Sequence, residues 1–264
     1  MKFNDFDKKM RVYEESIDQC IPPEVYLIAR LDGRGFTRLT KQICQFEAPF
    51  DTRFRDLMRM TVEHLMQSGF RVIYGYTQSD EISLLFHPYA DTFSRKVRKL
   101  NSLLAAETSA VFSMALGRVA VFDCRIVPLP NWQLVEDYFL WRQEDAHRNS
   151  LNSHAYWALR KDGLSPADAQ KQIKGASNAD KNELLFQHGI NYNDLPLWQK
   201  RGVGMYFEEK ELKGFNPRTG EATRTTRKRL TTNMELPLGD DYRAFLMNIL
   251  DEIGSTLMRA YARK

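Results

Sequence analysis

The amino-acid sequence predicts an α+β fold, in which an antiparallel sheet with helices packed on one face precedes a helical and β-hairpin part. Two observations lead to this class. Residues 1–132 contain, in order, patterns for a helix, a strand, a helix, a hairpin, a helix and a strand. Residues 133–160 contain neither Gly nor Pro and have apolar residues throughout, which predicts a long helix. We therefore expect two parts, 1–132 and 133–264, either as two domains or as one continuous domain.

The first elements follow from the spacing of apolar residues. Phe6, Met10 and Tyr13 recur at helical spacing near the N-terminus. The apolar run 25–31 then predicts a buried strand, because a short run of this kind is typical of a strand covered on both faces. Residues 51–68 again place their apolar side chains on one helical face.

A β-hairpin follows this helix. The strand-like runs 71–76 and 82–86 are joined by the polar segment 77–81. A helical pattern over 94–116 and a strand-like run over 118–127 complete the first part of the chain.

The second part continues, after the long helix, with two short helices that begin near Pro166 and Ser177, since Ser before a helix is a common N-cap. Residues 202–210 and 224–235 are strand candidates. A last helix begins at Asp241.

Composition narrows the class of protein. The 38 Lys and Arg residues against 34 Asp and Glu residues give a net charge of only +4, which does not indicate a partner. No run approaches the roughly 20 apolar residues of a membrane helix, so an integral membrane protein is excluded. The cysteines at 20, 44 and 124 stand singly, which argues against a disulfide framework. Together with an N-terminus that lacks a signal-peptide pattern, they suit a cytoplasmic protein.

Three carboxylates are candidates for a metal site. Asp32 ends the predicted strand 25–31, and Asp80 and Glu81 lie in the predicted hairpin turn. If the strands are neighbours, the three charges meet at one sheet edge, where a cation would stabilise them. Oxygen ligands suit Mg²⁺, and two such ions about 3.5–4 Å apart are typical of phosphoryl transfer. The alternative is that all three are ordinary polar turn residues.

Small and hydroxyl residues flank these carboxylates. Gly33 and Gly35 follow Asp32, and glycine lets backbone amides approach a phosphate closely. Ser79 precedes Asp80 and offers a hydroxyl to the same pocket. An Asp-Gly-Arg-Gly segment by itself is more often only a turn.

The segments RLDGRGF (30–36) and YGYTQSDEIS (74–83) resemble the two signature motifs of the tRNA-His guanylyltransferase family. The resemblance continues in the same order at 122–125, 141–143, 156–158, 179–183 and 190–193. It extends over most of the chain, up to about residue 197. Within this family the sequence is most similar to the bacterial-type 3′-5′ polymerases that repair tRNA 5′ ends.

The resemblance implies a polymerase-like palm and a nucleotidyltransferase that adds nucleotides to the 5′ end of tRNA, in the 3′-5′ direction. It implies two Mg²⁺ ions, held by Asp32, Asp80 and the backbone carbonyl of Gly33, with Glu81 as a further member of the catalytic motif. ATP or GTP would first activate the tRNA 5′-phosphate. The family also forms homotetramers, built as dimers of dimers.

The resemblance also implies a nucleotide site. The corresponding residues are Asp32, Gly33, Arg34, Gly35, Phe36, Thr37, Ser79 and Asp80. Lys181 and Glu183 match a family motif near the activation site. Without the resemblance, that segment would only be a polar helix start.

Two basic segments are further candidates for binding phosphate groups. Lys96 and Lys99 share one face of the predicted helix 94–116, and the matching positions of the family contact a triphosphate. A solvated helix face is the alternative. Arg224, Arg227, Lys228 and Arg229 form an RNA-backbone patch or, equally, a charged edge strand.

One motif departs from the eukaryotic pattern. Eukaryotic members have His-Ile-Asn-Asn where this chain has His147-Arg148-Asn149-Ser150. Asn149 is a candidate to bond a nucleotide and His147 to contact RNA, although buried polar residues that bond one another would give the same pattern. Because the changed motif resembles that of the bacterial relatives, the sequence favours template-dependent repair of 5′-truncated tRNA.

Two other hypotheses remain open. One is a dedicated tRNA-His guanylyltransferase that adds G at position −1, which the changed motif disfavours. The other, from a different class, is a non-catalytic RNA-binding protein on a relict palm, which the intact Asp32, Asp80 and Glu81 disfavour.

Overall fold

A computed structural model describes the backbone of residues 2–215 and 222–261, and the side chains of residues 2–211 and 226–251. Its strands are β1 (Tyr26–Gly33), β2 (Val72–Gln78), β3 (Glu81–Phe86), β4 (Phe122–Leu129), β5 (Val203–Phe215) and β6 (Ala222–Asn233). The helices α1 to α5 are Phe3–Glu15, Phe36–Arg38, Thr52–Gln67, Val97–Leu116 and Trp132–Lys161. The helices α6 to α9 are Pro166–Ile173, Asn178–Gln187, Leu197–Arg201 and Gly239–Tyr261. Short helical turns occur at η1 (Leu39–Ile43), η2 (Thr92–Arg95) and η3 (Tyr192–Asp194).

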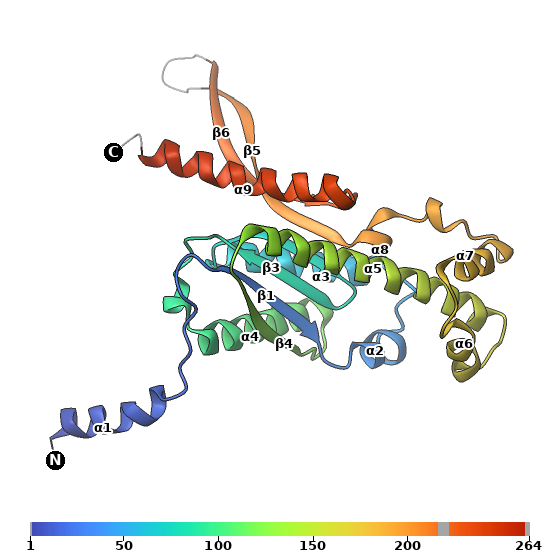
Figure 1. The fold of residues 1–264 in the computed structure, drawn as a ribbon, viewed down its shortest axis with the longest axis horizontal. Coiled ribbons are helices and arrows are strands. Elements are labelled where there is room, and N and C mark those ends of the chain that lie inside the picture. The colour runs from blue at the N-terminus through green and yellow to red at the C-terminus, as the bar shows by residue number, and fades with distance from the viewer. Residues whose placement is uncertain (1, 216–221, 262–264) are drawn as a thin grey trace.

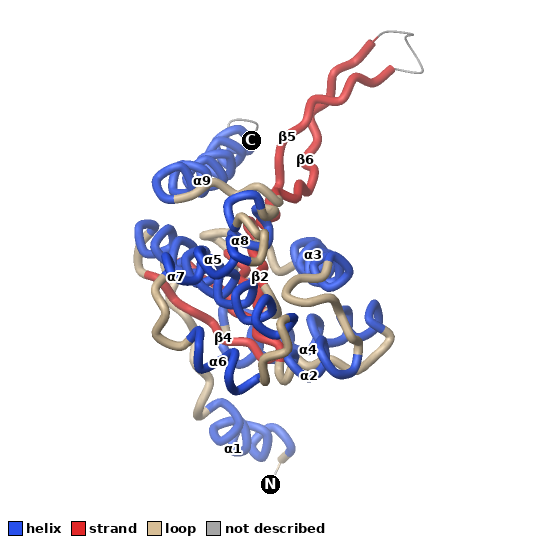
Figure 2. The backbone as a smooth tube through the Cα atoms, turned by 90° about the vertical axis from the view of Figure 1, so that its right-hand side faces the viewer, coloured by secondary structure: helices blue, strands red, loops and turns tan. Residues whose placement is uncertain are grey.

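The strands form one sheet in the order β4-β1-β3-β2-β5-β6, and each neighbouring pair is antiparallel (Figure 1). The predicted antiparallel α+β class is therefore confirmed. Because β2 pairs with β5, the sheet crosses the expected boundary at residues 132 and 133. The outer ends of β5 and β6 extend beyond the sheet as a projecting hairpin (Figure 2).

Alternating side chains of β1 divide the core between the two faces of the sheet. Leu27, Ala29 and Leu31 pack with α3 and α4, which are the helices that the sequence places on one face. Ile28 points to the other face and packs in a cluster with side chains of α5 and α9. The second part of the chain therefore covers the face that the first part leaves open.

Several element boundaries differ from the sequence prediction. The hairpin strands extend to Gln78 and Glu81, which leaves only Ser79 and Asp80 in the turn. The helix α4 begins only at Val97, because residues 93–95 have positive φ angles and Lys96 is extended, which an α-helix does not allow. The predicted N-terminal helix forms as α1 but buries none of its residues, and it lies apart from the sheet in Figure 1.

Candidate functional site

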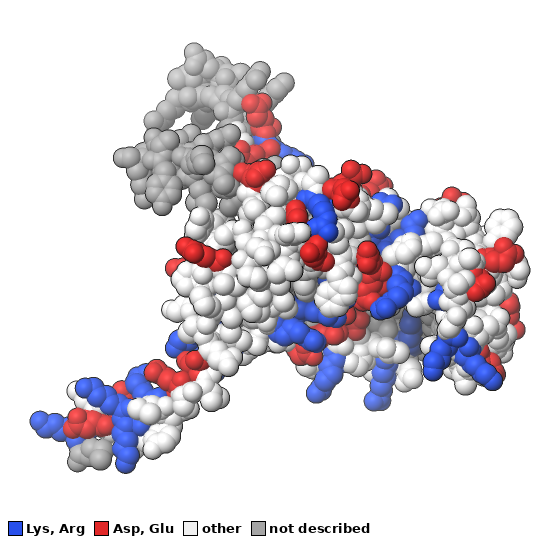
Figure 3. Space-filling model, viewed as in Figure 1, with Lys and Arg blue, Asp and Glu red and all other residues white. Residues whose placement is uncertain are grey.

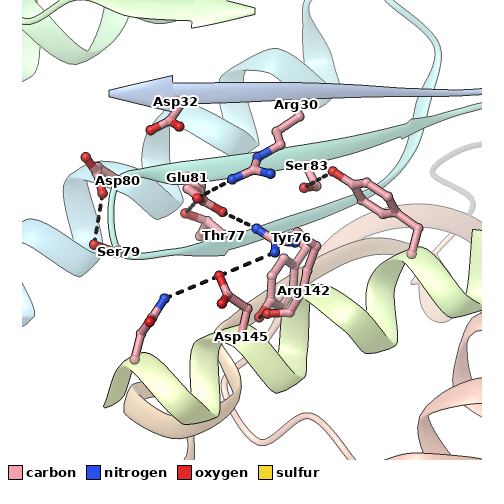
Figure 4. Close-up of polar contacts among 12 residues, drawn as sticks. Arg30, Asp32, Tyr76, Thr77, Ser79, Asp80, Glu81, Ser83, Arg142 and Asp145 are labelled. Atoms are coloured by element: carbon pink, nitrogen blue, oxygen red, sulfur yellow. Dashed lines mark hydrogen bonds and ion pairs between the residues drawn. The ribbon is translucent and has the colours of Figure 1, made fainter. Parts of the chain in front are cut away.

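The carboxylate pair, Asp32 and Asp80, lies where β1 ends beside the β2–β3 turn. In the register of the sheet, Asp32 is opposite Glu81 on β3. The Gly33 amide donates to the Asp80 carbonyl oxygen at 3.1 Å, which fixes the turn against the end of β1. Figure 4 shows the carboxylates of Asp32 and Asp80 next to each other at this end of the sheet. The adjacency that the sequence expected is therefore present.

The charges of the carboxylate pair are poorly neutralised by the protein. Burial, with smaller contributions from the charges of Asp32 and Glu81, raises the pKa of Asp80 to about 6. Burial and the charge of Glu81 also raise the pKa of Asp32. Arg125 Nη2 lies 3.9 Å from an Asp32 oxygen, at the limit of an ion pair. Two crowded oxygen donors of this kind fit a hard cation such as Mg²⁺.

Glu81 points away from the carboxylate pair into a cluster that we call the arginine clamp, made of Arg30, Glu81, Arg142 and Asp145 (Figure 4). Glu81 accepts from Arg30 and, at 2.8 Å, from Arg142 Nη1. Arg142 is only 3% exposed and also lies 3.3 Å from Asp145. The expected meeting of three free carboxylates does not occur, because the arginines already occupy the Glu81 carboxylate. Accordingly, no three His, Cys, Asp or Glu side chains among the described residues gather as a metal centre.

Gly33 and Gly35, which follow Asp32, are each explained by a different local requirement for glycine. A Cβ on Gly33 would lie 2.4 Å from the Phe36 ring, so the close approach of this ring requires glycine. Gly35 has a φ of 73° and precedes α2, a conformation that glycine adopts without steric cost. Phe36 itself is a core residue that packs on Phe112 and Phe122.

A cavity of about 400 Å³ opens beside the carboxylate pair. It lies between the α2–η1 segment, the start of α3, the β2–β3 turn, α5 and α8. Among its lining residues, Phe36, Thr37, Ser79, Asp80 and Asn149 were sequence candidates. Ser79 Oγ donates to Asp80 at 3.0 Å, and Asn149 Nδ2 donates to Asp145 at 3.3 Å, so the cavity borders both acidic groups. Of the remaining candidates nearby, Arg34 is exposed and is not part of the lining.

The sequence analysis missed Lys41 and the aromatic residues that line this cavity. Lys41, Phe46, Phe50, Trp157 and Trp198 also line it. Only Trp157 had a signal, because it falls in the segment 156–158 that resembles the family. Lys41 belongs to η1, a π-helical turn that the apolar spacing did not indicate.

Lys96 and Lys99 do not lie at the carboxylate pair. Lys96 Nζ donates to Asp18 at 2.9 Å, and an isolated bridge joins Lys96 to Cys20. Lys99 is exposed one turn later on α4. The strand β3 leads the chain away from the turn, so α4 starts beside the segment that enters β1, at the opposite end from Asp32. Closeness in sequence to the hairpin therefore did not mean closeness in space.

The other basic and polar candidates are also spread over the molecule. Lys181 and Glu183 lie on α7, outside the cavity lining, and Glu183 accepts from Gln187 at 3.0 Å. The ring of His147 contacts the ring of Tyr192 with a centroid distance of 5.4 Å, and burial lowers its pKa.

The basic residues of β6 lie on the projecting hairpin. Arg227, Lys228 and Arg229 are exposed there, whereas the side chain of Arg224 is outside the described residues. Arg229 is paired in register with Glu208, so acidic and basic side chains share this hairpin. Lys and Arg likewise lie among Asp and Glu on the face drawn in Figure 3 rather than in one basic patch.

Comparison with known proteins gives a consistent result. The family model described as tRNAHis guanylyltransferase matches residues 7–130, and that of the Thg1 C terminal domain matches residues 133–237. The chain is 35% identical over 205 residues to a probable tRNA(His) guanylyltransferase of Mus musculus, covering 74% of this chain and 68% of that protein. It is 33% identical over 258 residues to the human counterpart, covering 90% and 86%.

Solved structures show the same likeness. A bacterial tRNA(His) guanylyltransferase-like protein in complex with ATP superposes with a TM-score of 0.72 at 26% identity, covering 93% of this chain and 99% of that chain. The tRNA(His) guanylyltransferase of Saccharomyces cerevisiae superposes with a TM-score of 0.67 at 28% identity, covering 73% and 90%. In the part of the chain that the structure describes, no helix is both long and apolar enough to cross a membrane.

Proposed function

Because the chain belongs to the tRNA-His guanylyltransferase family, we propose that it is a nucleotidyltransferase that adds a guanine nucleotide to the 5′ end of tRNA-His. Nucleotide addition to a tRNA 5′ end is the activity that the names of the curated relatives support. Those names favour the dedicated guanylyltransferase over template-dependent repair, which reverses the order suggested by the His147–Ser150 segment. The observation that carries the proposal is the carboxylate pair at the edge of a nucleotide-sized cavity.

The residues at this edge fit Mg²⁺. Asp32, Asp80 and the Gly33 carbonyl would provide its oxygen ligands, and the substrate phosphates would complete them. Mg²⁺ bound here would activate an attacking hydroxyl and neutralise charge on the reacting phosphate. The raised pKa of Asp80 supports this assignment, because a carboxylate that is costly to ionise alone gains most from a cation.

The cavity side chains would bind and orient the nucleotide. The hydroxyls of Thr37 and Ser79 and the amide of Asn149 line the cavity, and the phosphates and ribose would be placed at the end where Ser79 bonds Asp80. Fixing the reacting groups in this way supplies much of the rate enhancement in phosphoryl transfer. Glu81 contributes indirectly, since its carboxylate is held by the arginine clamp.

A second candidate function is template-dependent repair of 5′-truncated tRNA. Two observations favour it, namely the segment His147-Arg148-Asn149-Ser150 and the superposition with the bacterial guanylyltransferase-like protein, which covers 93% of this chain. Repair would require the cavity to accept the nucleotide that the opposite tRNA strand specifies.

One assay separates these functions. The protein is incubated with ATP, GTP and Mg²⁺ and with either tRNA-His lacking G at −1 or a non-His tRNA lacking its first nucleotide. We expect efficient G addition to tRNA-His, with Asp32→Asn as the inactive control. Preference for the truncated tRNA would support repair instead. Tight tRNA binding without incorporation would favour the non-catalytic hypothesis.

The homotetramer and the cytoplasmic location stay predictions, and light scattering tests the first.

A further inference from the structure

Lys41 is a cation inside the cavity without a counterion. Its ammonium group lies 5.0 Å from the centre of the Trp157 ring, and it forms no ion pair with another described side chain. Burial lowers its pKa, opposed by the charge of Asp51. Asp51 is itself occupied, since it accepts from Arg53 and from the Glu47 amide. The other cavity cation, Arg55, is paired with Asp56 at 3.0 Å. Lys41 is thus the cavity cation that a ligand can use.

The position of Lys41 indicates which part of a nucleotide it meets. Asn149, Ser153 and Trp157 line the cavity from one face of α5, and eight residues of helix span about 12 Å. Asn149 is at the near end, because it bonds Asp145 of the arginine clamp beside the β2–β3 turn. Trp157 and Lys41 are at the far end. A nucleotide whose phosphates face Asp80 therefore extends its base toward Lys41 and Trp157.

The donor and acceptor groups at this end match guanine. A lysine ammonium only donates, and guanine presents the acceptor O6 where adenine presents the N6 amino donor, whereas N7 is an acceptor in both bases. Asn152 also lines the cavity, and its Oδ1 atom is buried without a partner among the described residues. That oxygen can accept from an N–H group of guanine. Trp157 offers a flat apolar surface for the ring.

We propose that Lys41 is a specificity-determining residue that donates to O6 and N7 of guanine, so that the cavity binds GTP more tightly than ATP. This inference rests on the proposed function and deepens it by assigning the choice of base to a side chain of the cavity. It also separates the two candidate functions, because a site that selects guanine suits G addition and does not suit copying of any template base.

Binding measured without tRNA tests the role of Lys41. Dissociation constants for GTP, ITP and ATP are determined by calorimetry in Mg²⁺ for the full chain and for Lys41→Met, which keeps the unbranched stem. ITP retains O6 and N7 of guanine. We expect the unaltered chain to bind GTP and ITP about tenfold more tightly than ATP, and Lys41→Met to lose most of this difference. Lys41→Arg should retain it, and Lys171→Met, an exposed lysine of α6, serves as the matched control.

Two results would overturn the inference. If Lys41→Met weakens the binding of GTP and of ATP equally, Lys41 contacts the phosphates. If the preference for GTP is unchanged in Lys41→Met, Lys41 does not recognise the base. A chain that selects guanine through Lys41 but extends no tRNA would contradict only the proposed function. A chain that extends tRNA-His with unchanged selectivity in Lys41→Met would contradict only this inference. If the unaltered chain binds no nucleotide, both are wrong.

Discussion

The carboxylate pair and the arginine clamp lie at the same end of the sheet, yet they handle charge in opposite ways. In the pair, the pKa of each carboxyl is raised, because the charges of Arg30 and Arg125 do not offset the burial of Asp32 and no arginine bonds Asp80 among the described residues. In the clamp, Glu81 is held between two arginines. Asp80 and Glu81 are consecutive residues, so one step along the chain separates a charge left for a ligand from a charge satisfied within the protein.

The difference shows how two consecutive residues, one in the turn and one on the strand after it, can serve both purposes. Glu81 is on β3 and is directed toward α5, where Arg142 is fully surrounded by protein. Asp80 is in the turn and is directed toward the end of β1 and the cavity. A buried ion pair contributes more to a defined geometry than to net stability. We infer that the arginine clamp holds the turn in place, and that this leaves the carboxylate pair free to bind a cation.

The largest effect is expected when the carboxylate pair is broken. Asp80→Asn keeps the shape of the side chain but removes the proposed metal ligand, so nucleotide addition to tRNA should fall by about 10³-fold or more. The thermal midpoint should stay equal or rise, because the change relieves repulsion from Asp32 in the metal-free protein. Single-turnover rates and thermal unfolding measure the two effects. Near-normal activity of Asp80→Asn would contradict the assigned role.

A change in the arginine clamp should have the opposite effect, lowering stability more than activity. Arg142→Met leaves Glu81 with one arginine and Asp145 without its buried partner, so stability should fall by about 3 kcal/mol. Urea unfolding measures this loss. Activity per folded molecule should decline much less than in Asp80→Asn.

A double variant separates charge from packing in the clamp. Glu81→Gln combined with Arg142→Met removes both charges of the Glu81–Arg142 pair, so its loss of stability should be smaller than the sum of the single losses. Additive losses would mean that Arg142 acts by packing alone. The claim that the clamp neutralises the charge of Glu81 would then be wrong.

The fold was largely predictable from the sequence because its signals are local. The helix 133–160 forms as α5, and the hairpin follows from two apolar runs around a polar turn. The covering of both sheet faces was not predictable in this way. It depends on β5 pairing with β2, a contact between residues more than 120 positions apart in the chain.

The site was predictable where neighbouring strands bring residues together, as for Asp32 and Asp80. The direction of the Glu81 side chain was not, because its arginine partners come from β1 and α5 and no spacing shows them. The cavity wall at Lys41 was missed for a similar reason, since a π-helical turn has no distinctive apolar period.

The smallest effect is expected at Lys96, where proximity in sequence was misleading. The structure pairs Lys96 with Asp18 at the end of β1 opposite to Asp32, and Arg98 bonds the same carboxylate. Lys96→Met should therefore leave the dissociation constant for GTP within about twofold and shift the urea midpoint only slightly, as expected for an ion pair at the surface. Calorimetry and urea unfolding check both values. A tenfold loss of GTP affinity would instead support the triphosphate role expected from the resemblance, and would require a nucleotide site beyond the carboxylate pair.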